Sequence, residues 1–394
     1  MAIILDNGCY TCKVGFSNET RPRLMLNSII KAKSERRTSF ISNQINDCKD
    51  LSGIFYLLPL QKGFLIDWDL ERQIWDYIFS KENLNLNVEF QEHNIVITEP
   101  HFNFTPVRKS MAEVVFEEFQ FKGFYTTAAS TLSSRSYLRE RNRHYCVVID
   151  SGFSFTHVVP YCHDRKLARA VRRIDVGGKL ITNHMKDLIS YRQLNVMDET
   201  YVVNQLKEGA CFVSKDFFAD MELAKNSDRK VSCKYVLPDF QNIKQGYIQD
   251  DKVESSLFSF DTYYIVKLKN ERFTVPEVLF NPSYIGRINQ IGISEAIVNA
   301  LDATPREIQP LLYKNIILTG GNAKLPGFKE RIFNDVRSIT NADFDVQIFS
   351  PEDPVTYAWE CGAKEVRDGA LDNLFVSRKE YEEFGYNICR NRFF

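Results

Sequence analysis

Two short turns combine an aspartate and a glycine directly after a run of apolar residues. The first lies in ILDNGCYTCKVGF, where Asp6 and Gly8 follow a predicted strand and Lys13 stands on the next one. The second lies in CVVIDSGFSFTHVVP, where Asp150 and Gly152 have the same spacing. Such turns aim backbone N–H groups at one point and can bind phosphate. Both are candidate phosphate loops, with an ordinary hairpin as the alternative, because Asp and Gly favour any tight turn.

A third glycine-bearing turn stands late in the chain, in NIILTGGNAKLPGF. The pattern predicts a buried strand over residues 316–319, then Gly320 and Gly321, and a helix that starts near Pro326. Glycines at a strand end let a ligand approach the backbone, and a nearby helix N-terminus favours an anion.

Together the three turns predict a cleft for a nucleoside triphosphate with Mg²⁺. Mg²⁺ is usually held by one or two carboxylates, through its waters, and by substrate phosphates. Asp6 and Asp150 are the candidate carboxylates for the metal; the alternative for each is an aspartate that bonds its own turn. His157, on the strand after the second turn, is placed to orient a water, although a lone histidine is more often a satisfied core residue.

The composition is that of a globular protein, with 394 residues, 44% hydrophobic and 26% charged. A net charge of −1 argues against nucleic-acid binding through overall charge. Basic residues gather within 31–37, 135–143 and 165–173, where a solvated surface is the simpler interpretation.

Nine scattered cysteines predict no disulfide framework, and Cys9 and Cys12 lack a second pair of zinc ligands. We expect no signal peptide and no membrane span, and therefore cytosol or nucleus.

The two Asp-x-Gly hairpins also indicate an internal repeat: a duplicated α/β domain with a cleft between the copies. Helices alternate with strands in both halves. Thr105 is placed to cap a helix that has Pro106 at its first position. A second helix, after residue 198, would carry Lys207 and Glu208 beside its apolar side.

These segments carry a resemblance to a known family. ILDNGCYTCKVGF, DSGFSFTHVVP, RIDVGGKL, NQLKE, NIILTGGNAKLPG and VTYAWE, in this order, resemble the actin superfamily from residue 3 to about 359, and more weakly to the end. The runs ITEPHFNF, GGKLITNHMKDLISYRQLNVMDETYV and NERFTVPEVLFNPS are typical of its nuclear actin-related branch.

The resemblance implies two RNase-H-like lobes around a central nucleotide cleft, each lobe with a smaller inserted subdomain. By this comparison the first lobe takes residues 1–140 and 357–394, with its small subdomain at about 28–59. The second takes residues 141–356, with its small subdomain at about 177–287.

Roles follow by position from the same resemblance. The first phosphate loop corresponds to Asp6, Asn7, Gly8 and Lys13, and the second to Asp150 and Gly152. Lys207 and Glu208 match residues that surround the adenosine, and Gly320 and Gly321 match the glycine pair along the nucleotide. His157 matches the histidine near the attacking water. The segment that connects the two halves corresponds to Asp175, Gly177 and Gly178.

Several positions depart from the actin pattern. Ala129 stands where actins have a glutamine beside the attacking water, and alanine cannot position water. Phe153 replaces an aspartate of the second loop. In the first loop, Tyr10 replaces glycine and Cys9 replaces serine. Tyr10 is expected to crowd the γ-phosphate region. Residues 42–57 share nothing with the loop by which actins grip one another in filaments.

We therefore expect a non-polymerising, non-enzymatic subunit of a nuclear chromatin-remodelling complex that exchanges a histone variant in nucleosomes. The resemblance implies partner subunits that include a small zinc-finger protein, contact with the nucleosome or its DNA only within the complex, and heterochromatin proteins as further candidates. It implies no membrane and no filament.

ATP or ADP with Mg²⁺ would serve as a structural ligand in a pseudo-ATPase cleft, with an empty cleft as the rival interpretation. A nuclear protein is expected, with the cytoplasm as a second compartment. The alternative is an active, polymerising actin-type ATPase; a sugar kinase or chaperone of the same broad fold has support from the two loops alone.

Overall fold

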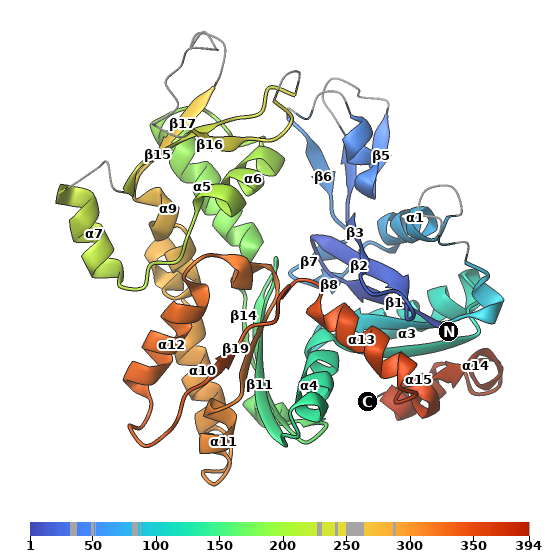
Figure 1. Ribbon diagram of the computed structural model, residues 1–394. Helices are drawn as coiled ribbons and strands as arrows, with labels where there is room; N and C mark the ends of the chain where they lie inside the picture. Colours follow the sequence, from blue (N-terminus) through green and yellow to red (C-terminus); the bar gives the residue numbers. More distant parts are fainter. Residues whose placement is uncertain are drawn as a thin grey trace.

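The computed structural model describes residues 1–31, 38–48, 51, 53–80, 86, 88–226, 231–240, 243–249, 264–286 and 289–393. Two large sheets lie next to each other, and helices cover them (Figure 1). None of the helices in the described ranges combines the length and the apolar character needed to traverse a bilayer.

The first sheet has the strand order β20-β10-β9-β1-β2-β3. Its strands are β1 (Ala2–Asn7), β2 (Thr11–Phe16), β3 (Arg23–Leu26), β9 (Asn94–Glu99), β10 (Gly123–Ala128) and β20 (Val376–Ser377). Its helices are α1 (Trp68–Phe79), α3 (Thr105–Glu113), α4 (Ala129–Glu140), α13 (Tyr357–Arg367), α14 (Arg378–Phe384) and α15 (Tyr386–Phe393).

The second sheet has the order β13-β12-β11-β18-β19, with β14 paired to β12. Its strands are β11 (Tyr145–Ser151), β12 (Thr156–Cys162), β13 (Arg165–Lys166), β14 (Arg172–Ile174), β18 (Ile316–Thr319) and β19 (Ile348–Phe349). Its helices are α5 (Gly178–Arg192), α6 (Thr200–Ala210), α7 (Phe217–Asn226), α9 (Glu271–Thr274), α10 (Ile293–Asp302), α11 (Gln309–Tyr313) and α12 (Phe328–Ile339).

The two sheets share one plan, which confirms the predicted α/β repeat. In the first, β1, β2 and β3 form an antiparallel meander, and β9 and β10 follow β1 in parallel. In the second, β11, β12 and β14 form the meander, and β18 and β19 follow β11 in parallel. Parallel strands of this kind are buried on both faces and are therefore nearly continuous apolar runs.

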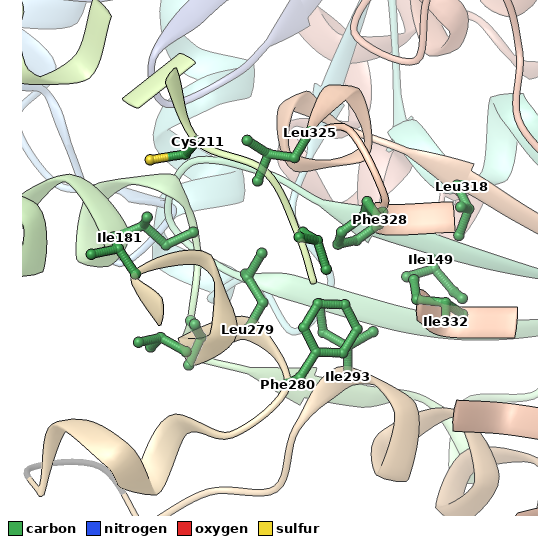
Figure 2. Close-up of a cluster of buried hydrophobic side chains, with 14 of the residues drawn as sticks. Ile149, Ile181, Cys211, Leu279, Phe280, Ile293, Leu318, Leu325, Phe328 and Ile332 are labelled. Carbon is green, nitrogen blue, oxygen red and sulfur yellow. The ribbon is translucent and has the colours of Figure 1, made fainter. Parts of the chain in front are cut away.

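Each sheet is fixed to its helices by an apolar core. Figure 2 shows the core of the second sheet, where Ile149 of β11 and Leu318 of β18 meet Phe328 and Ile332 of α12. In the first sheet, alternate residues of β1 face opposite sides. Ile3 and Leu5 belong to the core that includes α1, while Ile4 packs with Trp359 of α13.

The chain ends by returning to the first sheet. Trp359 is fully buried, and its Nε1 donates a hydrogen bond to the carbonyl of Ile4 at 3.0 Å. Farther on, β20 pairs antiparallel with β10, where Phe124 faces Val376. The last forty residues thus complete the sheet that the first residues begin.

Small sheets sit at the upper end of both halves (Figure 1). One is formed by β4 (Ile29–Lys31), β5 (Ser39–Ile41) and β6 (Phe55–Leu57), another by β15 (Cys233–Val236), β16 (Tyr247–Gln249) and β17 (Ile265–Leu268), and a hairpin by β7 (Leu60–Gln61) and β8 (Phe64–Leu65). The remaining short turns are 3₁₀ helices and one π turn: η1 (Ser42–Asp47), η2 (Phe90–Glu92), η3 (Val114–Glu118, π), η4 (Ala168–Ala170), η6 (Pro276–Leu279), η7 (Pro282–Ile285), η8 (Gly321–Lys324) and η9 (Asp372–Leu374).

The predicted cap of α3 is wrong, whereas α12 begins near Pro326 as predicted. Thr105 is the first residue of α3 rather than its cap, and its side chain caps nothing; Phe104 is the cap residue. Pro106 does lie in the first turn. Residue 326 precedes the 3₁₀-to-α junction, and α12 begins after Gly327, whose φ of +85° reverses the chain there.

Candidate nucleotide site

A cavity of about 510 Å³ lies between the two large sheets, where β1, β11 and β18 end. Its walls contain every residue that the sequence predicts for the nucleotide: Asp6, Asn7, Gly8, Lys13, Asp150, Gly152, His157, Lys207, Glu208, Gly320 and Gly321. They also contain the departing positions Cys9, Tyr10, Ala129 and Phe153, and Gly178 of the connecting segment. Of that segment, Asp175 lies outside the lining and pairs with Arg173 at 2.9 Å.

The first loop is a β1–β2 hairpin whose register sets its charges. Asp6 stands opposite Lys13, and their side chains form an ion pair of 3.1 Å. The other carboxylate oxygen of Asp6 accepts a hydrogen bond from Thr98 at the end of β9. Gly8 is required at the turn, because a Cβ there would lie 2.5 Å from the carbonyl of Thr11.

The second loop places Asp150 at the end of β11, opposite His157 on β12. Burial, together with the negative charge of Asp6, raises the pKa of Asp150 to about 6, and Lys13 acts in the opposite direction. Two buried carboxylates therefore share one lysine. A divalent cation beside them would relieve this repulsion.

The third loop joins the second by a side chain that the sequence analysis missed. Asn322 donates from its Nδ2 to Ser151 and to the carbonyl of Gly152. Gly320 has a φ of +89°, and a Cβ there would meet the Ser151 carbonyl at 2.3 Å. A Cβ on Gly321 would meet nothing within 4 Å, so the backbone there is bare and open to a ligand.

Helix α6 supplies the two remaining polar residues. Lys207 is buried, its ammonium donates to Thr182 and Asn204, and burial lowers its pKa. Glu208 accepts a hydrogen bond from the Nδ2 of Asn204. The two side chains are thus held by neighbours on α5 and α6, and Asn204, which bonds both of them, also donates to the Tyr10 hydroxyl of the first loop.

The wall near His157 offers little to an attacking water. His157 packs against Phe155 and against His101, whose ring centroid is 5.2 Å away. Burial and His101 lower the pKa of His157 well below 6.5, so the ring is neutral. Its Nε2 is buried and has no hydrogen-bond partner. Ala129 opens α4 with a methyl group, and the next hydroxyl, that of Ser130, is already bonded to His101 and Tyr161.

Comparison with known proteins decides the family. The profile of the family described as Actin matches residues 1–394. The chain belongs to the actin family. Among its relatives is the Drosophila melanogaster protein named actin-related protein 6, which is 42% identical over 99% of both chains. An Arabidopsis thaliana protein of the same name is 35% identical over 100% of this chain and 99% of its own. The Yarrowia lipolytica actin-like protein ARP6 is 35% identical over 99% of this chain and 97% of its own.

The predicted resemblance is confirmed, and with it the actin-like α/β fold. A nucleotide with Mg²⁺ is the ligand that the actin fold implies, and the residues present fit one. A phosphate could approach the open backbone at Gly321 and the ammonium of Lys13, which pairs with Asp6. A metal could neutralise the buried carboxylate of Asp150, whose pKa is raised. Bound there, the metal would neutralise charge between carboxylates and phosphates; Asp6 and Asp150 would hold it.

One feature separates this actin-family cleft from the expected pattern. The rings of Tyr10 and Phe153 stack on each other across the cleft, with centroids 4.9 Å apart and an interplanar angle of 29°. Both residues line the nucleotide cavity and also a second cavity of about 830 Å³ above it. We call this pair the aromatic partition. The sequence showed two odd residues in separate loops, but no pattern indicated that they meet.

The two cysteines near the first loop are free thiols. Cys9 accepts a hydrogen bond from Ser154, and Cys12 donates one to Asn7. Burial raises the pKa of both, so each is a neutral thiol. Within the described ranges, no group of three or more His, Cys, Asp or Glu residues is arranged to hold a metal.

Proposed function

We propose that this actin-family protein is a non-polymerising, non-enzymatic subunit of a nuclear chromatin-remodelling complex that exchanges a histone variant in nucleosomes. Its nucleotide cleft would hold ADP or ATP with Mg²⁺ as a structural ligand. The proposal rests on the similarity to proteins named actin-related protein 6 and on the nuclear actin-related segments of the sequence. Nuclear residence, with some protein in the cytoplasm, follows from the same reasoning.

The observation that carries the non-enzymatic part is Ala129. It occupies the cavity wall on the side of His157, where actins place a glutamine beside the attacking water. Loss of a group that positions or deprotonates water costs about 10²- to 10⁴-fold in rate. Burial, His101 and the positive charge of Arg173 all lower the pKa of His157, so its neutral ring is a weak base.

The non-polymerising part is supported by residues 42–57. Ile45, Cys48 and Ile54 are buried in a small core with Ile30 and Phe40, and Tyr201 of α6 packs against it. The actin filament loop must reach out to a neighbouring subunit, whereas these side chains face inward. A filament needs two complementary patches on every subunit, so losing one stops growth. Residues 49, 50 and 52 of this segment lie outside the described ranges.

We expect the purified chain to hydrolyse ATP no faster than buffer and to stay in solution. The measurements are phosphate release and sedimentation at high protein concentration with ATP and Mg²⁺, with conventional actin as the positive control under both conditions. Turnover or a pellet comparable to that of actin would support the alternative, a polymerising ATPase.

The cellular role is tested by the proteins that copurify with a tagged chain from nuclei. We expect a fixed set of remodeller subunits, among them a small zinc-finger protein, in constant proportion, with heterochromatin proteins as further candidates. Recovery of cytoskeletal proteins in their place would contradict the proposal. A cytoplasmic extract processed in the same way is the control.

The basic residues within 135–143 and 165–173 are the candidates for contact with nucleosomal DNA, but several of them are paired with carboxylates. Arg135 and Arg139 share the carboxylate of Glu365, at 3.8 and 2.9 Å. Arg173 pairs with Asp175, and its guanidinium lies over the rings of Phe64 and Phe155. The remaining arginines include Arg141, Arg143, Arg165 and Arg169, which are exposed. We propose that this remainder meets phosphate only when partner subunits hold it close to DNA.

A further inference from the structure

The second cavity, of about 830 Å³, is shared by the two halves of the chain, and we call it the upper cavity. One wall comes from α5 and α6, and the other from the end of β4 and from residues 53–58 around β6 (Figure 1). The aromatic partition separates it from the nucleotide cavity, since Tyr10 and Phe153 line both. Its described lining contains none of the residues proposed to hold the nucleotide. The upper cavity is therefore a separate candidate site.

Contacts between the two halves fix the shape of the upper cavity. The backbone N–H of Gly53 donates to the carboxylate of Glu199 at 2.9 Å. Asn204 on α6 donates to the hydroxyl of Tyr10 at 3.2 Å. Tyr201, also on α6, packs against the small core that β4 and β5 share. A site that is formed in advance in this way binds its ligand at a lower entropic cost.

Three lysines give the upper cavity a positive charge: Lys31, Lys179 and Lys186. Asp198 is the one acidic residue among the described residues of its lining. Lys179 and Lys186 stand two turns apart on α5 and therefore on the same face of that helix. Burial lowers the pKa of Lys186, and the charge of Lys179 acts in the same direction, although Asp187 and Asp198 oppose them.

Most of this positive charge has no carboxylate to balance it. Among the described residues, neither Lys31 nor Lys179 has a carboxylate within ion-pair distance, and both are exposed. The ammonium of Lys186 donates to two neutral oxygens, the carbonyl of Met197 at 3.3 Å and the hydroxyl of Thr200 at 2.9 Å. The chain as a whole has a net charge of −1, so the basic lining is a local feature. Negatively charged groups are attracted to such a site.

A tyrosine of the same lining lacks a hydrogen-bond acceptor. The hydroxyl of Tyr56 is buried and has no partner among the described residues. Burial raises the pKa of Tyr56 well above 10, so the hydroxyl keeps its proton and remains a donor. A buried donor without an acceptor is costly, and an anionic oxygen is the strongest acceptor that a ligand could offer it.

Apolar surface continues from the upper cavity to the outside of the molecule. Phe55 and Met197 line the cavity, and their side chains are 64% and 45% exposed. A small anion would leave both in water, whereas a protein segment would cover them. A nucleic acid would need free aromatic faces on which its bases could stack, but the rings of Tyr10 and Phe153 are stacked on each other.

From these observations we infer that the upper cavity is the docking site for an acidic segment of a partner protein. The segment places carboxylates at Lys31, Lys179 and Lys186. Its apolar side chains cover Phe55 and Met197. The inference rests on the proposed role as a subunit of a complex, and it adds the surface at which a partner binds and the chemistry of the partner segment. It does not depend on the nucleotide.

The test is carbodiimide cross-linking of the complex purified through the tagged full chain. Carbodiimide joins a lysine to a carboxylate that touches it. We expect Lys31 or Lys179 to be joined to aspartates or glutamates of one partner segment. We also expect acetic anhydride to acetylate both lysines about fivefold more slowly in the complex than in the free chain, because an ion pair covers them.

Each other outcome of this test is informative. If the complex forms and both lysines react as fast as in the free chain, the inference is overturned and the proposed function stands. If no complex forms, the proposed function itself fails. Protection without a cross-link to any carboxylate overturns the acidic character of the segment, and protection that nuclease removes assigns the site to a nucleic acid.

The cross-linked segment, made as a fluorescent synthetic peptide, is then titrated against the full chain by anisotropy. Lys31→Glu/Lys179→Glu should weaken binding about tenfold, because two attractions become repulsions. Lys329→Glu makes the same change at an exposed lysine of α12, outside the described lining, and should leave the affinity unchanged. A folded double variant that binds as tightly as the wild type overturns the inference.

A change in the peptide repeats this measurement without any change in the chain, should the double variant fail to fold. Replacing the acidic residues of the peptide by glutamine keeps its size and removes its charge. We expect the glutamine peptide to bind the wild-type chain about tenfold more weakly, and added salt to weaken the acidic peptide but not the glutamine peptide. Equal affinity of the two peptides contradicts the assigned chemistry.

Discussion

Replacing Arg331 with alanine is expected to lower the free energy of unfolding by about 3–5 kcal/mol. Arg331 lies on α12, and its two terminal nitrogens each donate at 2.8 Å to one carboxylate oxygen of Glu277. The Glu277 side chain is fully buried. Arg331 also donates to the carbonyl of Ser214 and to Asp335. Without the guanidinium, Glu277 would keep a buried charge with no cation to match it.

Urea unfolding followed by circular dichroism measures this loss. Arg378→Ala is the matched control, because its pair with Glu382 is exposed on α14 and should contribute less than about 1 kcal/mol. The double variant Arg331→Met/Glu277→Gln should recover part of the stability, since it removes the charge together with its partner. A loss in Arg331→Ala no larger than in the control would contradict the assigned role.

The second large effect concerns pH and Glu71, which is buried on α1 beneath the first phosphate loop. Its Oε1 accepts a hydrogen bond from Asn7, and among the described residues Trp75 and Asn27 lie close enough to lower its pKa as well. Burial raises the pKa of Glu71 from 4.5 to about 7, while the hydrogen bond from Asn7 acts in the opposite direction. The carboxyl group is therefore protonated in the folded protein at pH values where the unfolded chain has released the proton.

The sign of the effect follows from this difference. Between pH 4.5 and about 7 the folded state holds a proton that the unfolded state lacks, so the free energy of unfolding falls as pH rises through that window. Each unit corresponds to about 1.4 kcal/mol, so the loss is about 3 kcal/mol by pH 7. Glu71→Gln keeps the acceptor for Asn7 and removes the titration. We expect this variant to be more stable than the wild type above pH 7, by up to about 3 kcal/mol, and equal to it near pH 4.5.

Urea unfolding of both proteins at pH 5 and pH 8 provides the measurement. Asp150 titrates in a similar range, but it is present in both proteins, so the difference between them isolates Glu71. Glu92→Gln, on the exposed turn η2, is the control for a glutamate-to-glutamine change outside the core. Parallel pH profiles for wild type and Glu71→Gln would show that Glu71 titrates normally.

The local parts of the fold and site could be predicted from sequence because short-range rules determine them. An apolar strand that runs into Asp6 and Gly8, repeated at Asp150 and Gly152, specifies two hairpins, and both are present. The convergence of these loops with Gly320 and Lys207 followed from the actin resemblance rather than from spacing. Local rules failed at Thr105, because Phe104 took the cap position and no side chain caps α3.

Contacts between distant segments could not be predicted. The partners Tyr10 and Phe153, and likewise Cys9 and Ser154, come from different halves of the chain, and no periodicity links them. Asn322 joins two loops through a side chain that sequence reasoning treats as an ordinary turn residue. The pairing of Arg139 with Glu365 could not be predicted for the same reason, because the two residues lie far apart in the sequence.

The return of the chain end to the first sheet has a consequence for biosynthesis. Until the ribosome has added α13 and β20, β10 is an open sheet edge, and the apolar surface around Ile4, Val96 and Tyr125 lacks Trp359. Unpaired edges and uncovered apolar surface promote aggregation. The first sheet of the nascent chain therefore stays prone to aggregation until β20 and Trp359 have been synthesised. A chain that stops before residue 359 is therefore expected to aggregate more readily than the full chain.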